Sequence, residues 1–404
     1  MGLGQSMRNS EDRHQCTPFW TNLTMDVSLP PLAFFNEVQS PALVFIPEQI
    51  AANIQKMIDL VGGDPNRLRP HCKTHKCSEI AKMLIEAGIL QHKCATIVEA
   101  LMLARAGAKD VLLSYPLIGP NLPIMAKLCH TYQGVKFSFL VDNHDALACA
   151  NSAFQGMANR PSVWLDIDVG MGRTGIGPLT NHRAVGDLAK EVVDLGFVLK
   201  GIHLYDGHVN LPLMEGRMEM GNQIRLAGLN LRKELEEHLG LPLGIIVGGS
   251  PSFMAHSQMG WGNAVFSPGT LVLQDCGYGG KYSDMAGFRP AALLLTRVIS
   301  RPGPGRITLD LGYKAISADS PLEKRAQFPE ILGAQIVMQS EEHLVLEAPG
   351  ADEIPLGQAL WAIPFHVCPT VALHDRATIW QGGQLIPSWE IDARTRFIQR
   401  DHHS

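Results

Sequence analysis

The sequence predicts an α/β protein: a (β/α)8 barrel of the TIM type followed by a second, C-terminal all-β domain. From Ala42 to about Asp284, short apolar runs alternate with amphipathic stretches, which is the pattern of βα units. The runs begin about every 28 residues, and eight of them match the eight strands of a closed parallel barrel. Beyond Asp284, turn signals separate the apolar runs and no long helical stretch intervenes, which is typical of an all-β domain.

The barrel strands are expected at Leu68–Lys73, Lys93–Ile97, Asp110–Pro116, Val135–Asp142, Ser162–Val169, Phe197–Asp206, Gly244–Ser250 and Ala264–Pro268. Between them, apolar residues at three- and four-residue steps predict helices such as Ser78–Ala87, Glu99–Ala106, Asn143–Phe154 and Glu215–Leu239. The first run leads into His71–Lys76 rather than into the Gly-rich turn of a doubly wound sheet. This favours the barrel over an open sheet.

The strands of the second domain are expected at Ala291–Ile299, Arg306–Leu309, Ala334–Met338, His343–Glu347 and Ala362–Val367. The chain therefore divides into a leader (1–37), the barrel (38–285) and the β domain (286–404). The leader is a mobile segment, an extra strand of the second domain, or both.

Composition excludes several classes of protein. Of the 404 residues, 46% are hydrophobic and 18% are charged, which is too apolar for a disordered chain. A net charge of −5 argues against binding to nucleic acid. No apolar run approaches the roughly 20 residues that cross a bilayer, and the polar N-terminus lacks the apolar stretch of a secretory signal. Eight scattered cysteines suit free thiols, so we expect a cytoplasmic location.

Active sites of such barrels lie at the carboxyl ends of the strands, and phosphate often binds after strands seven and eight. The first strand ends at Lys73, which suits either a Schiff base with an aldehyde cofactor or a solvated lysine in a basic turn. The seventh ends in Gly248, Gly249 and Ser250, which suit a phosphate-binding loop or an ordinary turn.

Two further strand ends carry groups for the same rim. After the fifth strand, glycines bracket Arg173, and the sixth strand ends in Tyr205 and His208. Together with Lys73, these residues outline a site for a phosphorylated aromatic ring, although each alone is more typical of a structural residue.

In the second domain, His366 and Cys368 are two residues apart on an expected strand, so both side chains would point to one face. Imidazole and thiolate are a zinc-type ligand pair, with positions left open for water and substrate. A buried cysteine beside an unrelated histidine gives the same pattern.

These motifs together resemble those of the fold-type III pyridoxal phosphate enzymes, whose barrel is of the alanine racemase kind, and within them the branch of D-threonine aldolase and D-serine dehydratase. The motifs that carry the resemblance are Arg69–Lys76, Cys94–Thr96, Asp168–Gly175, Tyr205–His208, Gly248–Ser250, Ser267–Thr270 and His366–Thr370. They follow the family's order and span most of the chain.

The resemblance implies a role for each candidate residue. Lys73, the first lysine of its motif, would attach the cofactor in preference to Lys76. Arg173 would hydrogen-bond the cofactor's 3-hydroxyl and Tyr205 would lie against its ring. The phosphate would be held by Gly248, Gly249 and Ser250. His366 and Cys368 would bind one divalent metal ion: zinc, manganese or magnesium.

One position departs from the family. Leu271 stands where a tyrosine near the pyridine nitrogen is common, so the contact to that nitrogen is left open.

The resemblance further implies a lyase on small D-amino acids with a 3-hydroxyl, and a homodimer with its site near the subunit interface. The best prediction is D-threonine aldolase, which yields glycine and an aldehyde. The alternative is D-serine dehydratase, which yields pyruvate and ammonia. Cys368 as a ligand is similar to the dehydratases, whereas Tyr205–His208 and Gly312–Ala315 look more like the aldolase group.

Two other classes fit less well. A racemase needs a second base, and Tyr313 is the only tyrosine after residue 285. A non-enzymatic pyridoxal phosphate carrier of the barrel-only type would lack the second domain.

Overall fold

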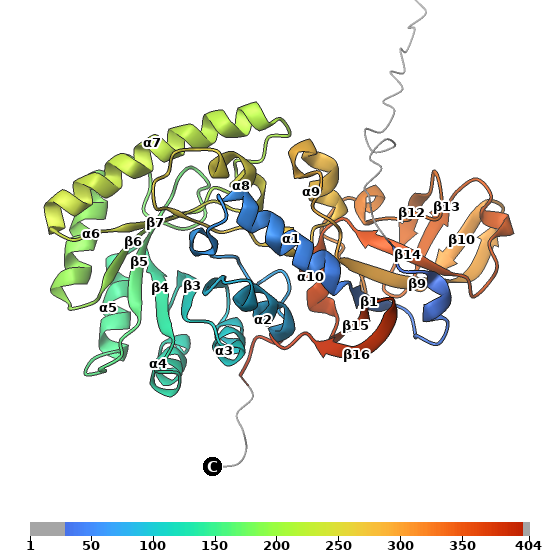
Figure 1. Ribbon diagram of the computed structural model, residues 1–404, viewed down its shortest axis with the longest axis horizontal. Coiled ribbons are helices and arrows are strands. Elements are labelled where there is room, and N and C mark those ends of the chain that lie inside the picture. Colours follow the sequence, from blue (N-terminus) through green and yellow to red (C-terminus); the bar gives the residue numbers. More distant parts are fainter. Residues whose placement is uncertain (1–28, 399–404) are drawn as a thin grey trace, which may run out of the picture.

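The computed structural model describes residues 29–398, which form two domains side by side (Figure 1). One is a curled parallel sheet wrapped by helices, and the other is a mostly antiparallel sheet. The predicted fold class is confirmed. Between residues 29 and 398, no helix is long and apolar enough to span a membrane.

Seven regular strands form the barrel sheet in chain order, and every neighbouring pair is parallel. They are β2 (Gln91–Cys94), β3 (Asp110–Pro116), β4 (Lys136–Val141), β5 (Ser162–Ile167), β6 (Leu199–Leu204), β7 (Gly244–Val247) and β8 (Val265–Phe266). Each overlaps an apolar run from which a strand was predicted.

The eighth position of the barrel is occupied by residues 68–73, which do not form a regular strand. Isolated parallel bridges join this segment to β8 on one side and to β2 on the other, where His71 pairs with Lys93. Pro70 has no N–H to donate, so it interrupts the hydrogen-bond ladder in the middle of the segment. The barrel therefore closes through an irregular first stave, and this stave carries Lys73.

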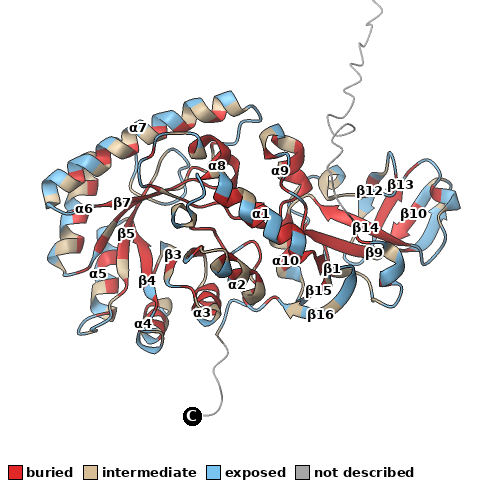
Figure 2. Cartoon of the chain, viewed as in Figure 1, coloured by how far each residue is buried: buried red, intermediate tan, exposed pale blue. Residues whose placement is uncertain are grey.

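Helices cover the outside of the barrel, and Figure 2 shows their exposed faces turned away from the buried strands. They are α1 (Pro47–Leu60), α2 (Ser78–Glu86), α3 (Ile97–Ala106), α4 (Asn121–Thr131), α5 (His144–Ala153), α6 (His182–Asp194), α7 (Met214–Leu239) and α8 (Ser250–Ser257). The short helix α9 (Cys276–Lys281) instead contacts β14 of the second domain. The four predicted helical stretches coincide with α2, α3, α5 and α7.

The second domain is a nine-stranded sheet. Its strands are β1 (Ala42–Phe45), β9 (Ala292–Gly303), β10 (Arg306–Leu309), β11 (Ala326–Gln327), β12 (Gln335–Gln339), β13 (Leu344–Glu347), β14 (Ala359–Pro364), β15 (Arg376–Gln381) and β16 (Gln384–Glu390). The order is β12-β13-β10-β9-β1-β15-β16, and β14 pairs with β9 and β11 off this path.

The N-terminal part of the chain contributes to this second sheet. β1 lies between β9 and β15, although the sequence-based boundary at residue 38 assigned it to the barrel. Upstream of it, the ring of Phe35 packs on Trp361 at 4.8 Å between centroids, and the Trp361 indole donates to the carbonyl of Pro30. The described part of the predicted leader thus belongs to the second domain. Its residues 1–28 lie outside the described residues.

One strand of the second domain ends earlier than the sequence predicts. β14 stops at Pro364, and Val367–Leu373 forms the helix α10. Pro369 has no N–H for a sheet, but in the first turn of a helix that N–H has no intrahelical partner to lose. The prediction that His366 and Cys368 share one face of a strand is therefore wrong: His366 precedes α10 and Cys368 lies in its first turn.

Candidate active site

The interior of the barrel changes from apolar to polar toward the carboxyl ends of its strands. The apolar layer consists of Leu112, Leu140, Trp164 and Ile246. The next layer toward the mouth, which we call the polar layer, consists of His71, Lys93, Asp166 and His203. All four are at most 8% exposed, so this charge-bearing layer is held inside the protein. Such burial of titratable groups is typical of functional sites.

Asp166 and His203 form a hydrogen-bonded pair in the polar layer. His203 Nδ1 lies 2.7 Å from Asp166 Oδ1, and Thr174 Oγ1 donates to the other carboxylate oxygen at 2.8 Å. Burial lowers the pKa of His203 to about 4, and the charge of Lys93 adds to this effect. Burial alone would raise the pKa of Asp166, but the hydrogen bonds from His203 and Thr174 lower it. His203 Nε2 has no partner within residues 29–398, so it is available to a ligand.

The two lysines of the Arg69–Lys76 motif have different surroundings. Lys73 is exposed at the mouth, and its backbone N–H donates to His71 Nδ1 at 3.2 Å. Lys76 instead forms an ion pair with the fully buried Glu99 of α3. Glu99 also accepts the backbone N–H of Ala95 at 2.6 Å. Lys73 is therefore the lysine of this motif that remains free to attach a cofactor.

Arg173 and Tyr205 lie together at the rim of the barrel. The Arg173 guanidinium is 4.5 Å from the centroid of the Tyr205 ring, a cation–π distance. The loop that carries Arg173 is shaped by Asp168, whose Oδ1 accepts three successive backbone N–H groups at 2.8–3.0 Å. Gly175 has φ +103°, and a Cβ there would lie 2.6 Å from the nitrogen of Asp168. This loop therefore holds one guanidinium beside the Tyr205 ring.

The ends of β7 and β8 form a cradle of backbone groups. Ser250 Oγ accepts the N–H groups of Gly269 and Thr270, each at 3.0 Å, and ties the two ends together. A Cβ on Gly249 would lie 3.1 Å from Tyr205 Cε2, so only glycine leaves this space open. The helix α8 begins at Ser250, and helix N-termini attract phosphate.

A buried network supports this cradle from below. Asp206 and His256 are both fully buried, with His256 Nε2 2.6 Å from Asp206 Oδ2. Ser252 Oγ donates to Asp206 at 2.8 Å, and the N–H of Gly249 donates to Ser252 Oγ at 3.2 Å. The indole of Trp261 completes the chain by donating to His256 Nδ1. The cradle thus keeps its shape without a ligand.

These residues fit pyridoxal phosphate. The cradle suits the phosphate, Tyr205 offers a ring face and Lys73 offers an exposed amine at the same mouth. Ser267 Oγ, at the end of β8, is buried with no partner among the described residues, so it can bond a ligand's polar atom. Leu271 is fully buried in the hydrophobic core and offers no hydrogen bond to the cofactor.

The second domain brings His366 and Cys368 to this mouth. Cys368 Sγ lies 3.1 Å from Thr74 Oγ1 and 3.5 Å from Thr270 Oγ1, so it touches the stave of Lys73 and the end of β8. His366 interacts with Cys368 and hydrogen-bonds Asp319 through Nδ1. The imidazole and the sulfur therefore meet at one place, with a carboxylate that orients the imidazole.

Sequence reasoning missed several residues of this site. Asp319 follows no strand end or motif, and its contact with His366 joins positions 47 residues apart. Lys93 was placed at the start of a predicted strand, whereas β2 spans Gln91–Cys94 and puts it near the mouth. Thr74 was recognised as part of the lysine motif, but its contact with Cys368 has no local signal.

His71, Cys72 and Glu99 form the one cluster of three metal-ligating side chains found between residues 29 and 398. Glu99 already accepts Lys76 and Ala95, and it accepts the Cys72 thiol at 3.7 Å. Burial and the nearby carboxylate of Glu99 raise the pKa of Cys72 well above its usual value, so the thiol stays protonated. This cluster is a hydrogen-bond network that shapes the first stave.

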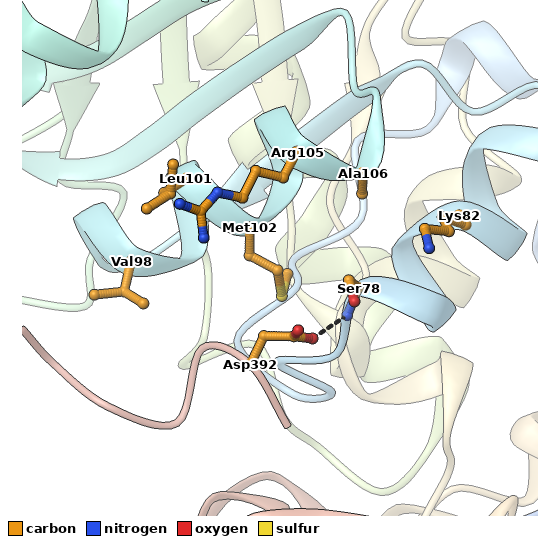
Figure 3. A pocket seen from close by; sticks show the side chains of 8 residues that line it. All are labelled: Ser78, Lys82, Val98, Leu101, Met102, Arg105, Ala106 and Asp392. Atoms are coloured by element: carbon orange, nitrogen blue, oxygen red, sulfur yellow. Dashed lines mark hydrogen bonds between the residues drawn. The ribbon is translucent and has the colours of Figure 1, made fainter. Parts of the chain in front are cut away.

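A cavity of about 190 Å³ lies outside the barrel, between α2 and α3 (Figure 3). Asp392 closes one side and accepts the N–H of Ser78 at the start of α2 at 2.7 Å. The side chains of Lys82, Met102 and Arg105 line the rest. The cavity marks where the C-terminal segment docks on the barrel, and it holds none of the residues at the mouth.

Comparison with protein families agrees with this geometry. Residues 47–267 match the family model of the alanine racemase N-terminal domain, which is more than half of the chain. The chain belongs to this family. Residues 291–380 match a second model, described as a putative serine dehydratase domain. The resemblance to the fold-type III pyridoxal phosphate enzymes is thereby confirmed.

Relatives match over nearly the whole chain. A D-threonine aldolase from Arthrobacter sp. is 28% identical over 375 residues, or 91% of this chain and 97% of its own. A 3-hydroxy-D-aspartate aldolase from Paracoccus denitrificans (strain Pd 1222) is 28% identical over 89% of this chain and 93% of its own. A D-threo-3-hydroxyaspartate dehydratase from Delftia sp. (strain HT23) is 26% identical over 87% and 97%.

Solved structures show the same two-domain arrangement. The D-threonine aldolase from Filomicrobium marinum superposes with a TM-score of 0.78 at 25% identity, covering 89% of this chain and 96% of its own. The D-threo-3-hydroxyaspartate dehydratase from Delftia sp. HT23 has the same TM-score at 22% identity, covering 88% and 98%. The latter comparison supports the fold alone.

Proposed function

We propose that the protein is a pyridoxal phosphate- and metal-dependent lyase that cleaves D-amino acids with a 3-hydroxyl, as a D-threonine aldolase does. The observation that carries this proposal is the contact of Cys368 with Thr74, because it joins the metal-type pair of the second domain to the stave of Lys73. The aldolases and the dehydratase among the relatives support the same reaction class.

Each part of the site has its own task in this proposal. Lys73 would attach the cofactor, Arg173 would bind its ring oxygen, Tyr205 would support its ring and the cradle would hold its phosphate. When bound, pyridoxal phosphate supplies an electron sink for the bond broken at Cα. His366 and Cys368 would hold one divalent ion at the mouth, where it would supply a Lewis acid for the substrate hydroxyl.

Two observations favour a second candidate, a D-serine dehydratase. Cys368 provides a thiolate, which suits zinc, and the domain that carries it matches the putative serine dehydratase model. The two candidates differ in the bond that breaks, Cα–Cβ for the aldolase and Cβ–O for the dehydratase.

The deciding experiment incubates the holoenzyme with D-threonine and with D-serine, and measures glycine, acetaldehyde and pyruvate. We expect glycine and acetaldehyde from D-threonine, loss of both after chelation, and recovery when Zn²⁺ or Mn²⁺ is added. Pyruvate from D-serine as the main product would select the dehydratase. If neither D-threonine nor D-serine gives any of these three products in the presence of cofactor and metal, the lyase proposal is contradicted.

The homodimer and the cytoplasmic location remain predictions. Sedimentation of the purified protein at several concentrations tests the dimer, and fractionation of the source cells tests the location.

A further inference from the structure

Lys93 is a buried lysine at the barrel mouth for which the proposed function has no role. It is 3% exposed and lies on β2. The β-bridge to His71 places both side chains on the interior face of their neighbouring staves. The Lys93 amine lies 5.7 Å from the centroid of the ring of Tyr205, the residue that directly follows β6, four staves away. The lysine side chain therefore reaches across the mouth.

The charged and titratable groups that face Lys93 come from the first stave, from β5 with the loop that follows it, and from β6. They are Arg69, His71, Lys73, Asp166, Arg173, His203 and Tyr205. Asp166 is the one carboxylate in this set, and its oxygens already bond His203 and Thr174. Within residues 29–398 the Lys93 amine forms no ion pair or hydrogen bond.

Burying an ammonium group without a partner is unfavourable, so its neutral form is stabilised relative to its charged form. Burial, followed by the charge of Lys73, lowers the pKa of Lys93 to about 7. In the protein without a ligand, the amine therefore loses its proton at a lower pH than an exposed lysine does. An anion placed against it would favour the charged form again.

The chemistry of the cofactor indicates which anion this is. In pyridoxal phosphate, the ring carbon beside the one that bears the aldehyde carries the 3-oxygen, which is an anion at neutral pH. Lys73 would take the aldehyde, and Arg173 would contact the 3-oxygen. The charges of Lys73 and Arg173 both lower the pKa of Lys93. The Lys93 amine and the Arg173 guanidinium also both lie near the Tyr205 ring. It is therefore placed for the same oxygen.

We propose that Lys93 is a second cation for the 3-oxygen of the cofactor, and that it takes up a proton from solvent when the cofactor binds. This inference rests on the cofactor of the proposed function and not on its substrate or metal. Lys93 then acts as a cofactor-binding residue, and it makes cofactor affinity depend on pH.

The sign of this dependence follows from the protonation of the amine. Below pH 7 Lys93 is already charged in the free protein, so binding needs no proton. As the pH rises above 7, binding must take up a proton first, so the affinity falls until the amine is neutral in the complex as well.

The test measures binding of pyridoxamine phosphate to the cofactor-free protein by calorimetry between pH 6 and 9. This ligand has no aldehyde, so attachment to Lys73 does not contribute. At pH 6, Lys93→Met should bind roughly tenfold to a hundredfold more weakly than wild type, the range of one charge-assisted hydrogen bond. The difference in affinity between wild type and Lys93→Met should become smaller as the pH rises to 9. Lys93→Arg should keep much of the affinity and lose the wild-type pH dependence.

Two controls isolate the ring oxygen and the buried position. An analogue of the ligand without the 3-oxygen should bind wild type and Lys93→Met equally. Lys82→Met, which removes an exposed lysine paired with Glu79 on α2, should behave as wild type. At pH 8 the heat of binding should depend on the buffer's ionisation heat for wild type, as proton uptake requires, and not for Lys93→Met.

The outcomes separate this inference from the proposed function. Equal affinity of wild type and Lys93→Met at every pH would overturn the role of Lys93 and leave the cofactor site standing. A wild type that binds neither pyridoxamine phosphate nor pyridoxal phosphate would overturn the proposed function itself. Lys93→Met should fold, because replacing a lone buried amine by an apolar side chain is often neutral or stabilising. If Lys93→Met does not fold, the test is made on wild type alone. Proton uptake on binding pyridoxamine phosphate, and none on binding the analogue without the 3-oxygen, would support the role of Lys93, and equal uptake with both ligands would overturn it.

Discussion

Lys76 forms an ion pair with Glu99, a residue with no exposed surface, and this pair ties the turn after the first stave to the helix α3. Lys76 also has φ +50°, a conformation that side-chain-bearing residues rarely adopt. The pair separates the two lysines of the Arg69–Lys76 motif in the way that their order in the motif implies. Lys76 serves structure, and Lys73 is left for chemistry.

We expect Lys73→Ala to lose the visible absorbance of the bound cofactor and Lys76→Ala to keep it. Lys76→Ala should instead destabilise the protein by about 1–3 kcal/mol, because it leaves the buried carboxylate of Glu99 without its cation. Absorbance spectra and urea unfolding of both variants check this. A colourless Lys76→Ala beside a coloured Lys73→Ala would mean that the lysines are assigned in the wrong order.

Gly249→Val should weaken binding of the cofactor about tenfold or more, the effect of losing a charge-assisted hydrogen bond, with little effect on folding. Its side chain would meet the Tyr205 ring and fill the space beside the backbone N–H groups of the cradle. Gly260→Val is the matched control, because a Cβ there meets nothing within 4 Å. Equilibrium dialysis against pyridoxal phosphate gives the comparison, and wild-type affinity in Gly249→Val would place the phosphate elsewhere.

Replacing either proposed metal ligand should separate the metal from the cofactor. His366→Ala and Cys368→Ala should each lose about one metal ion per chain and reduce lyase activity by about a hundredfold or more, because losing even a hydrogen-bond partner of a metal ligand costs about 10- to 100-fold. Both should stay coloured, since the cofactor residues lie in the barrel. Cys149→Ala, at an exposed cysteine, is the control. A full metal content in both variants would show that His366 and Cys368 do not bind the metal ion.

Changing the thiolate to a carboxylate tests the same pair more finely. Cys368→Asp should shift the preferred ion from zinc toward manganese or magnesium, because oxygen ligands suit harder cations. Activity restored to the chelated variant by each ion in turn measures this shift. An unchanged preference for zinc would show that Cys368 does not contact the ion.

The cofactor-free protein should lose stability as the pH falls from about 6.5 to about 4. Burial lowers the pKa of His75 to about 3 and those of His92 and His203 to about 4, so these side chains stay neutral while the unfolded chain takes up protons. Each can lower the free energy of unfolding by about 1.4 kcal/mol per pH unit in this window.

Urea unfolding at pH 7.5, 6 and 5 measures this loss. His92→Gln should show a shallower dependence, since the amide can still donate to the carbonyl of Ile89 and does not titrate. Stability that is constant from pH 7.5 to 5 would mean that these histidines accept protons in the folded protein.

Local patterns predicted the parts of the fold that depend on local order. The period of βα units placed all seven regular barrel strands, and Pro70 explains why the first stave is irregular. The position of β1 had no such signal, because a four-residue apolar run is the same in either sheet. Its pairing with β9 and β15 is a long-range contact, and strand preference depends on such contacts more than on sequence.

The site shows the same division. Lys73, Arg173 and Tyr205 were found because active-site groups follow strand ends in this fold. His366 and Cys368 were paired through an expected strand, yet they meet at the start of α10. Their pairing was therefore predicted from a conformation that the chain does not adopt.

The position of β1 in the second sheet affects the order in which that sheet can form during synthesis, and it determines which truncated fragments can fold. During synthesis, β1 emerges before the barrel. Its antiparallel neighbour β9 and its parallel neighbour β15 emerge only after the whole barrel has been made. A fragment that begins at residue 286 would lack the strand between β9 and β15 and expose two unpaired edges. Such a fragment should aggregate, whereas a circular permutant that keeps residues 29–45 attached to the second domain should fold.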